Sequence, residues 1–133
     1  MQVNAELDPQ QQSILQENNA LKTAQSSLSA AQYQQRAAAV TTRAQTFLQL
    51  KQLRNAQIGR TKALAEQAIG QVMDPLLEAV LAEHHCSVVF DRSTAYRWNG
   101  AMDLTDQVRA GLDQRMPTIQ FNLASPESVQ GRP

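Results

Sequence analysis

The chain is poor in the residues on which most active sites and thick cores are built. Among its 133 residues there is one cysteine, and only six are aromatic. A single cysteine forms no internal disulfide, so it says nothing about the redox compartment. Basic and acidic residues number twelve each, so the net charge favours no partner. No apolar run is long enough to span a bilayer, and the first ten residues do not resemble a secretory signal.

What the chain has in abundance is glutamine and alanine, which together supply 38 residues. Both are good helix formers, so this composition favours long helices with thin apolar seams. The segment "ELDPQQQ" predicts a helix start, with Asp8 as cap and Pro9 in the first helical position. Leu7, Ile14, Leu21 and Leu28 then recur every seven residues, as in a coiled coil.

A second seam follows a possible turn at "SSLSAAQ", where Ser29 and Gln32 have the spacing of a capping box. Its members are spaced four and three residues apart: Tyr33, Ala37, Val40, Ala44 and Phe47. A turn near 26–30 makes residues 1–83 a helical hairpin arm, with a kink near Pro75. One uninterrupted helix over 9–58 is the alternative. Tyr33 and Phe47 are read as seam residues rather than exposed contacts.

The long second helix extends well beyond the first, and its continuation is apolar. Leu76 and Val80 belong to this continuation, which needs cover from other subunits or from a further segment. Two β-rich runs, "CSVVF" and "TAYRW", then predict a β hairpin in a small β/α body over 84–123. A short helix holding Val108 follows, Thr118–Leu123 is a candidate edge strand, and residues 124–133 are predicted to be a disordered tail.

Basic residues are concentrated in one window. Residues 18–65 contain no acidic residue, which gives this window a formal charge of +7 and predicts a basic arm. Such an arm attracts nucleic acid, anionic lipid or acidic polypeptide, although a solvated helical face explains it equally well. Few aromatics are available to stack on bases, so we expect no nucleic-acid partner. The seven basic residues are Lys22, Arg36, Arg43, Lys51, Arg54, Arg60 and Lys62.

The segment "AEHHCSVVFD" combines two histidines with the only cysteine, which suggests a metal or catalytic site. Adjacent histidines point in different directions, and three or four ligands must converge on a zinc ion. We therefore predict no metal, no cofactor and no enzymatic activity. His84 and His85 are expected to end a helix, and Cys86, Val88 and Phe90 to share one face of a strand.

The stretch "VMDPLLEAVLAEHHCSVVFDRSTAYRWNGAMDLTDQVRAGLD" resembles the OmpH/Skp family of periplasmic chaperones. The resemblance is carried by a helix running into "SVVFD", then "STAYRW" and a "DLTDQV" cap. It implies a mainly α fold with a small β element, in which three chains form a jellyfish-like homotrimer. The arms would hold unfolded outer-membrane proteins in a cavity in the periplasm, without ATP. The family's first strand is absent from this chain.

The resemblance assigns roles to residues in this numbering. It implies client binding by the basic arm, with anionic lipid or lipopolysaccharide as a further partner in some members. It makes Leu21, Leu28, Tyr33, Val40 and Phe47 seam or client contacts. Body or subunit contacts would be Leu76, Val80, Val88, Phe90, Tyr96 and Val108. The alternative function is a coiled-coil adaptor whose basic arm docks a fixed anionic partner or a membrane surface.

Overall fold

The computed structural model describes residues 2–130 and divides the chain into two compact units. The first unit contains residues up to Gly59 together with the C-terminal segment from Ala124, and the second spans Arg60–Leu123. The described elements are α1 (Gln2–Thr23), α2 (Ala30–Glu83), η1 (Arg92–Thr94), η2 (Gly100–Met102), α3 (Thr105–Arg115) and α4 (Pro126–Val129). None of these helices is both long and apolar enough to cross a membrane.

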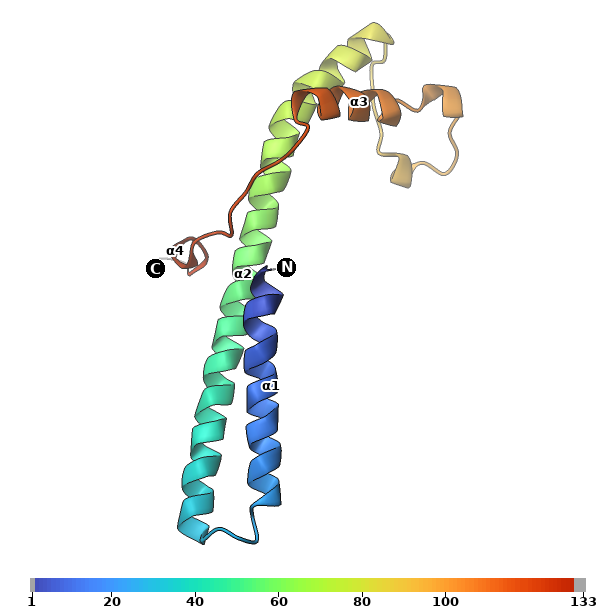
Figure 1. Cartoon of the computed structure of the whole chain (residues 1–133). Helices are drawn as coiled ribbons and strands as arrows, with labels where there is room; N and C mark the ends of the chain where they lie inside the picture. The colour runs from blue at the N-terminus through green and yellow to red at the C-terminus, as the bar shows by residue number, and fades with distance from the viewer. Residues whose placement is uncertain (1, 131–133) are drawn as a thin grey trace. The chain divides into compact units, whose positions relative to one another are not determined.

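In the first unit, α1 lies antiparallel to the first part of α2 (Figure 1). A short turn over residues 24–29 joins them. The predicted capping box is confirmed: the Gln32 backbone N–H donates to Ser29 Oγ at 3.3 Å, and the Ser29 backbone N–H donates to Gln32 Oε1 at 3.1 Å. Two N–H groups that α2 cannot satisfy internally are thereby paired, which fixes where the helix begins.

The predicted start of the first helix is wrong. α1 already begins at Gln2, and Pro9 lies inside it rather than at its first turn. Proline removes one backbone donor, so the carbonyl of Ala5 loses its usual partner within the helix. Packing outweighs this cost: Leu7 is buried, and Glu6 forms an ion pair with Arg54 of α2. Both contacts require a helical backbone ahead of the proline.

The heptad seam holds α1 to α2. Leu7, Leu21 and Phe47 are buried in the seam, and Ile14 and Val40 are half-buried between them. Leu28 and Tyr33, close to the turn, are also half-buried. Burying a large apolar side chain contributes about 1.5–3 kcal/mol, so a few such contacts hold the two helices together. The polar residues between the leucines keep the seam thin.

α2 continues as one helix through Gly59, Gly70 and Pro75. No new helix begins at Pro75. Pro75 removes the N–H that would bond to the carbonyl of Gln71, but Leu76 and Val80 on the following turn are buried and hold the helix in place. A kink at Pro75 stays a prediction.

In the second unit, α3 packs on the last turns of α2. A Cβ built on Gly111 of α3 would come within 2.8 Å of Leu76 Cδ1, so the absence of a side chain at Gly111 permits this close contact. Leu76 and Val80 are therefore covered within this chain, and Val108 of α3 is half-buried. Other subunits are not needed to bury these two residues, contrary to the argument from helix length.

Gly111 and Gly59 have different surroundings, so substitutions at the two positions should change stability in opposite directions. We expect Gly111→Val to destabilise the chain by about 1–3 kcal/mol, because the added atoms overlap Leu76. Gly59→Ala should instead stabilise it by about 0.5–1 kcal/mol, since a Cβ there meets nothing within 4 Å and alanine favours the helix. Thermal unfolding followed by circular dichroism measures both changes. Equal melting temperatures for the two variants would contradict the α3–Leu76 contact.

The end of α2 is a Schellman motif. The Cys86 backbone N–H donates to the carbonyl of Leu81 at 2.9 Å and the His85 N–H to that of Ala82 at 3.2 Å. His85 has φ of 53°, the left-handed conformation that this motif requires. The expectation that the histidines end a helix is confirmed, with His85 where glycine is the usual residue.

The predicted β hairpin does not form: residues 2–130 contain no strand. Neither "CSVVF" nor "TAYRW" forms a strand: η1 ends at Thr94, the first residue of "TAYRW", and the Asp91 carboxylate accepts from the Ser93 N–H at 2.7 Å. Residues 118–123 also form no strand. The reason is physical, because an extended segment becomes a strand only when another segment satisfies its N–H and C=O groups.

The C-terminal segment is not simply a disordered tail. Ala124 belongs to the first unit, and α4 forms one helical turn with Pro126 at its start. The Ser128 N–H donates to the carbonyl of Ser125 at 3.1 Å, and the Gln130 N–H to that of Pro126 at 3.0 Å. The prediction for residues 131–133 lies outside the described residues.

Candidate functional site

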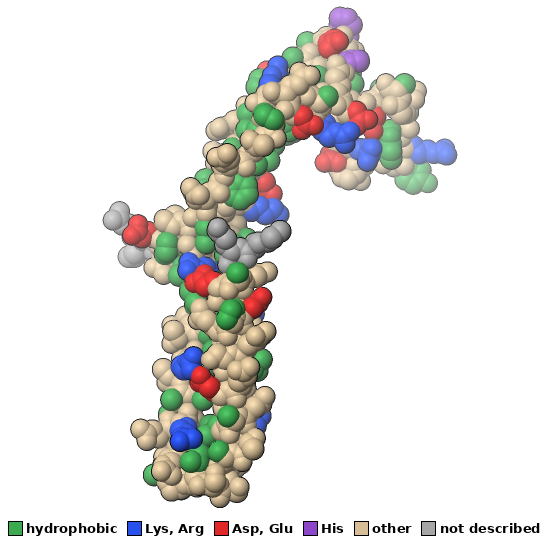
Figure 2. Space-filling view, in the orientation of Figure 1, with side chains coloured by type: hydrophobic (Ala, Val, Ile, Leu, Met, Phe, Trp, Pro, Cys, Tyr) green, Lys and Arg blue, Asp and Glu red, His purple; other side chains and the backbone are tan. Residues whose placement is uncertain are grey.

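The basic arm is not uniformly free to attract anions, because two of its arginines are paired with α1. Arg43 forms an ion pair with Glu17, and Arg54 forms one with Glu6. The two pairs are eleven residues apart on each helix, which is three helical turns, so the antiparallel register is the same at both. Figure 2 shows basic and acidic side chains side by side on the hairpin.

The folded arm therefore carries less net charge than the window of residues 18–65 suggested. Residues 1–59 hold five basic and three acidic side chains, a formal charge of +2. The window chosen on sequence grounds began after Glu17, and so it left out the three carboxylates of α1, two of which form ion pairs with α2. Sequence reasoning missed Glu6 and Glu17, although their separation matches that of Arg43 and Arg54 and could have revealed the register.

Three arm cations keep their charge exposed. Lys22, Arg36 and Lys51 are exposed, and within residues 2–130 none of them forms an ion pair. Arg60 and Lys62 fall in the second unit, where Lys62 pairs with Glu66 four residues later at 3.6 Å. The long-range attraction of the hairpin for an anionic partner therefore comes mainly from Lys22, Arg36 and Lys51.

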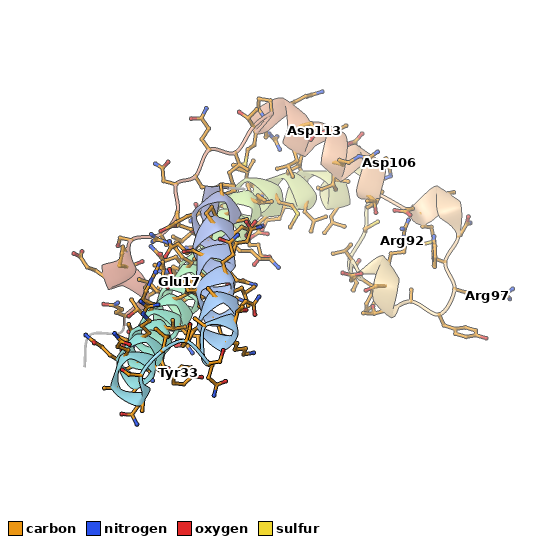
Figure 3. The ribbon with its side chains drawn as sticks, turned by 60° about the horizontal axis from the view of Figure 1, so that its bottom comes forward. Glu17, Tyr33, Arg92, Arg97, Asp106 and Asp113 are labelled. Atoms are coloured by element: carbon orange, nitrogen blue, oxygen red, sulfur yellow. The ribbon has the colours of Figure 1, made fainter. Side chains whose placement is uncertain are left out.

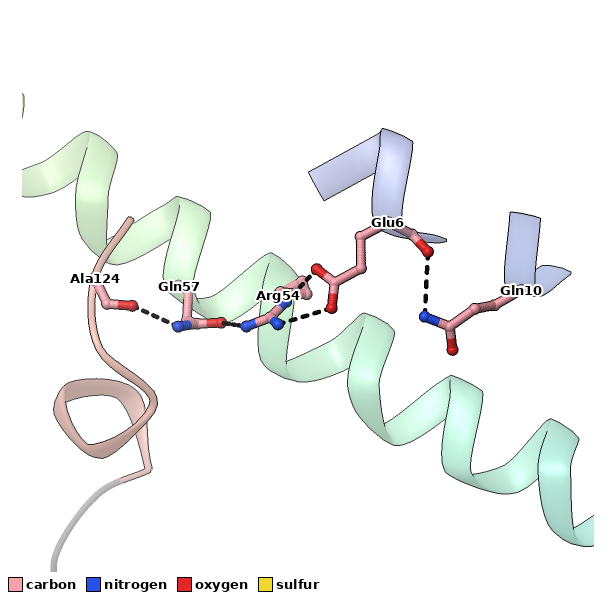
Figure 4. A network of polar contacts seen from close by, with 5 residues as sticks. All are labelled: Glu6, Gln10, Arg54, Gln57 and Ala124. Carbon is pink, nitrogen blue, oxygen red and sulfur yellow. Dashed lines mark hydrogen bonds and ion pairs between the residues drawn. The ribbon is translucent and has the colours of Figure 1, made fainter. Parts of the chain in front are cut away.

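A polar network joins both helices of the hairpin to the C-terminal segment (Figure 4). Arg54 donates from Nε and Nη2 to the two carboxylate oxygens of Glu6, at 2.9 and 2.8 Å. The hydrogen bond to Arg54 and its positive charge lower the pKa of Glu6 below its usual value, and the hydrogen bond to Glu6 and its negative charge raise the pKa of Arg54. Arg54 Nη1 also donates to Gln57 Oε1 at 2.8 Å, and the Gln57 amide donates to the carbonyl of Ala124.

A shallow groove lies between the two helices of the hairpin. Its volume is about 180 Å³, and apolar carbon from both helices forms part of its lining. It is open to solvent and too small to hold a drug-sized ligand. The lining residues are Gln10, Ile14, Thr42, Arg43, Thr46 and Phe47.

The second unit exposes an apolar segment after the end of α2. Phe90 is 76% exposed and Tyr96 98% exposed, and Val88 and Trp98 are also largely uncovered. Local contacts nevertheless organise this segment: the Arg92 guanidinium lies 5.5 Å from the Trp98 ring centre and donates to Asp103 at 3.1 Å. Arg97 points outward from the same loop (Figure 3). Such a concentration of uncovered apolar side chains marks an interaction surface.

The histidines at the end of α2 serve the local fold. His84 Nε2 lies 2.8 Å from Gln107 Oε1 of α3, and Gln107 Nε2 donates to Glu83 at 3.1 Å. Cys86 is an exposed free thiol. Within residues 2–130, no three His, Cys, Asp or Glu side chains are grouped so that they could hold a metal ion. These contacts give His84 a structural role at the α2–α3 contact.

Comparison with known proteins gives the family. The model for "Outer membrane protein (OmpH-like)" matches residues 1–112. This chain belongs to the OmpH-like family. A crystal structure of an OmpH-like outer membrane chaperone from Caulobacter crescentus CB15 is similar to it, with a TM-score of 0.73 and 31% sequence identity. That match covers 93% of this chain and 73% of the Caulobacter chain. No curated protein sequence matches this chain.

Membership of the OmpH-like family confirms the resemblance seen in the sequence and supports a chaperone role in general. It also agrees with the helical architecture of two long helices and their connecting turn. The family is a non-enzymatic one, located in the periplasm.

Proposed function

We propose that this OmpH-like chain is a periplasmic holdase that binds unfolded outer-membrane proteins without ATP. The observation that carries the proposal is the family match over residues 1–112, together with an arm whose surface is polar and only weakly charged. A holdase must bind many sequences and release them again. Many weak contacts achieve this better than a single deep pocket.

The proposed assembly is a homotrimer whose body is formed by the second unit. The exposed segment around Val88, Phe90 and Tyr96 supports this proposal, since these side chains are uncovered in the single chain. On assembly, residues 86–90 and 94–98 would gain partners for their backbone groups and pair as the small β element of the body. Three hairpin arms would then enclose the client. Anionic lipid or lipopolysaccharide is a further proposed ligand of the exposed arm cations.

The electrostatic part of this function predicts a specific loss of client capture. Reversing Lys22, Arg36 and Lys51 to glutamate should weaken capture of an unfolded outer-membrane barrel protein by at least about tenfold at low salt. Near physiological ionic strength the loss of capture should fall to about threefold, because salt screens the exposed charges. Aggregation of the client after dilution from urea, followed by light scattering, measures the capture.

The control reverses the two paired arginines of the arm, which changes the formal net charge by −4 against −6 for the three exposed residues. Reversing Arg43 and Arg54 instead places like charges beside Glu17 and Glu6, so we expect loss of helicity as well as capture. If the variant of the exposed residues keeps full capture at low salt, arm electrostatics play no part. The native mass of the wild-type chain, measured with and without client, distinguishes the two functions. A trimer that encloses a client gains the mass of that client, whereas an adaptor binds one fixed partner and does not gain it.

A further inference from the structure

The contact between Gln57 and Ala124 has an unusual combination of properties. Gln57 is only 2% exposed although it is polar and lies on a two-helix arm. Its side-chain amide donates to a backbone carbonyl, that of Ala124, which lies 67 residues further along the chain. Both residues belong to the first unit. One contact of the C-terminal segment with α2 is therefore made to a backbone atom, whose chemistry does not depend on the side chain.

The orientation of this amide is fixed by its neighbours. Arg54 can only donate hydrogen bonds, so Gln57 must turn its oxygen toward Arg54 and its NH₂ toward Ala124. Arg54 is held in turn by both carboxylate oxygens of Glu6. Donation by a charged guanidinium to the amide oxygen polarises the amide and strengthens its N–H as a donor. Glu6, Arg54 and Gln57 thus present one oriented donor on α2 (Figure 4).

We propose that Gln57 is a binding site for a backbone carbonyl of an extended polypeptide, and that residues 124–130 occupy it in the free chain. We name residues 124–130 the C-terminal strap. An unfolded client would displace the strap and present its own carbonyl to Gln57. The inference rests on the proposed holdase function and adds a defined contact to it. Recognition of a carbonyl suits such a function because every residue of every client carries one.

The strap has the features of a replaceable occupant. Its one helix, α4, has four residues, none of them buried, and Ser125 makes no side-chain cap bond. A helix of one turn gains little stability of its own. When the strap leaves, Gln57 becomes accessible to water or to a client, so no buried amide is left without a partner.

Displacement can be measured on the full-length chain by hydrogen exchange. Amides of Ser128 and Gln130 are hydrogen-bonded in the strap, so they should exchange more slowly than in an unstructured peptide. Saturation with a urea-unfolded outer-membrane barrel protein should raise their exchange rates to those of the unstructured peptide. Unchanged strap exchange at full client occupancy would overturn the inference while leaving the holdase function intact. Failure of the client to bind at all would overturn both.

Substitutions give a second, independent readout. Val129 is half-buried and Gln130 exposed, so Val129→Asp should loosen the strap while Gln130→Asp serves as a control of equal charge. Val129→Asp should bind client about fivefold more tightly, the change expected from one competing hydrogen bond. Adding Gln57→Met should abolish the gain. Equal client affinity for the Val129 and Gln130 variants would show that the strap is only a structural clasp.

Discussion

Replacing Phe47 by alanine is expected to separate the two helices of the hairpin. Phe47 is 8% exposed and is the largest buried side chain in the thin seam of the first unit. Its truncation should cost about 3 kcal/mol, because the lost contacts and the cavity both act against the folded state. With so few other buried residues in the seam, that loss is a large fraction of what holds α1 to α2. The far-ultraviolet circular dichroism signal during urea unfolding measures it.

The neighbouring residue provides the control for Phe47. Leu48 is 56% exposed on the same helix, so Leu48→Ala should change stability by less than about 0.5 kcal/mol. Both substitutions remove apolar atoms, and alanine improves helix propensity more at Phe47 than at Leu48, so a larger loss of stability at Phe47 reports seam packing. Equal midpoints in urea for the two variants would mean that the hairpin is not held by this seam.

The second large effect is expected at the exposed apolar segment of the second unit. Val88→Asp combined with Phe90→Asp should reduce the native mass from that of the proposed trimer to that of one chain. Each carboxylate would have to be buried without a partner at the subunit contact, at a cost of several kcal/mol. In the single chain both positions are exposed, so the folded monomer should keep its helicity.

Sedimentation velocity of the double variant measures this loss of assembly, with Val89→Asp as the control. Val89 lies between the two positions, so in an extended segment its side chain points to the opposite face. We expect the charge at Val89 to weaken assembly less than the charges at Val88 and Phe90. An unchanged mass for the double variant would remove this segment from the proposed subunit contact and favour an adaptor of a different architecture.

Local patterns in the sequence predicted the hairpin well, because the residues that specify it act over short distances. The leucines at Leu7 and Leu21 recur with the seam period, and Ser29 and Gln32 carry the cap signal within one turn. The start of α1 could not be predicted in this way. Pro9 favours a helix start locally, whereas the burial of Leu7 depends on α2, which follows it in the chain.

The candidate site depended on pairings between residues distant in sequence. Glu17 and Glu6 cancel charges on Arg43 and Arg54 only after the chain has turned back on itself. The Gln57–Ala124 contact had no signal in the sequence, since neither residue belongs to a motif. The runs around Val88 and Tyr96 have a clear β-strand propensity. Propensity alone supplies no partner for the backbone, and neither run forms a strand in the single chain.

The constant register of the hairpin has a consequence for how such arms change length during evolution. Because the seam leucines Leu7 and Leu21 are two heptads apart, seven residues can be lost from α1 without moving its apolar stripe to another face. The same number must be lost from α2, or the Glu6–Arg54 contact shifts by two turns. The arm can therefore be shortened or lengthened by one heptad in each helix, on either side of the 24–29 turn. Such a change alters the length of the arm while the rest of the molecule keeps its sequence.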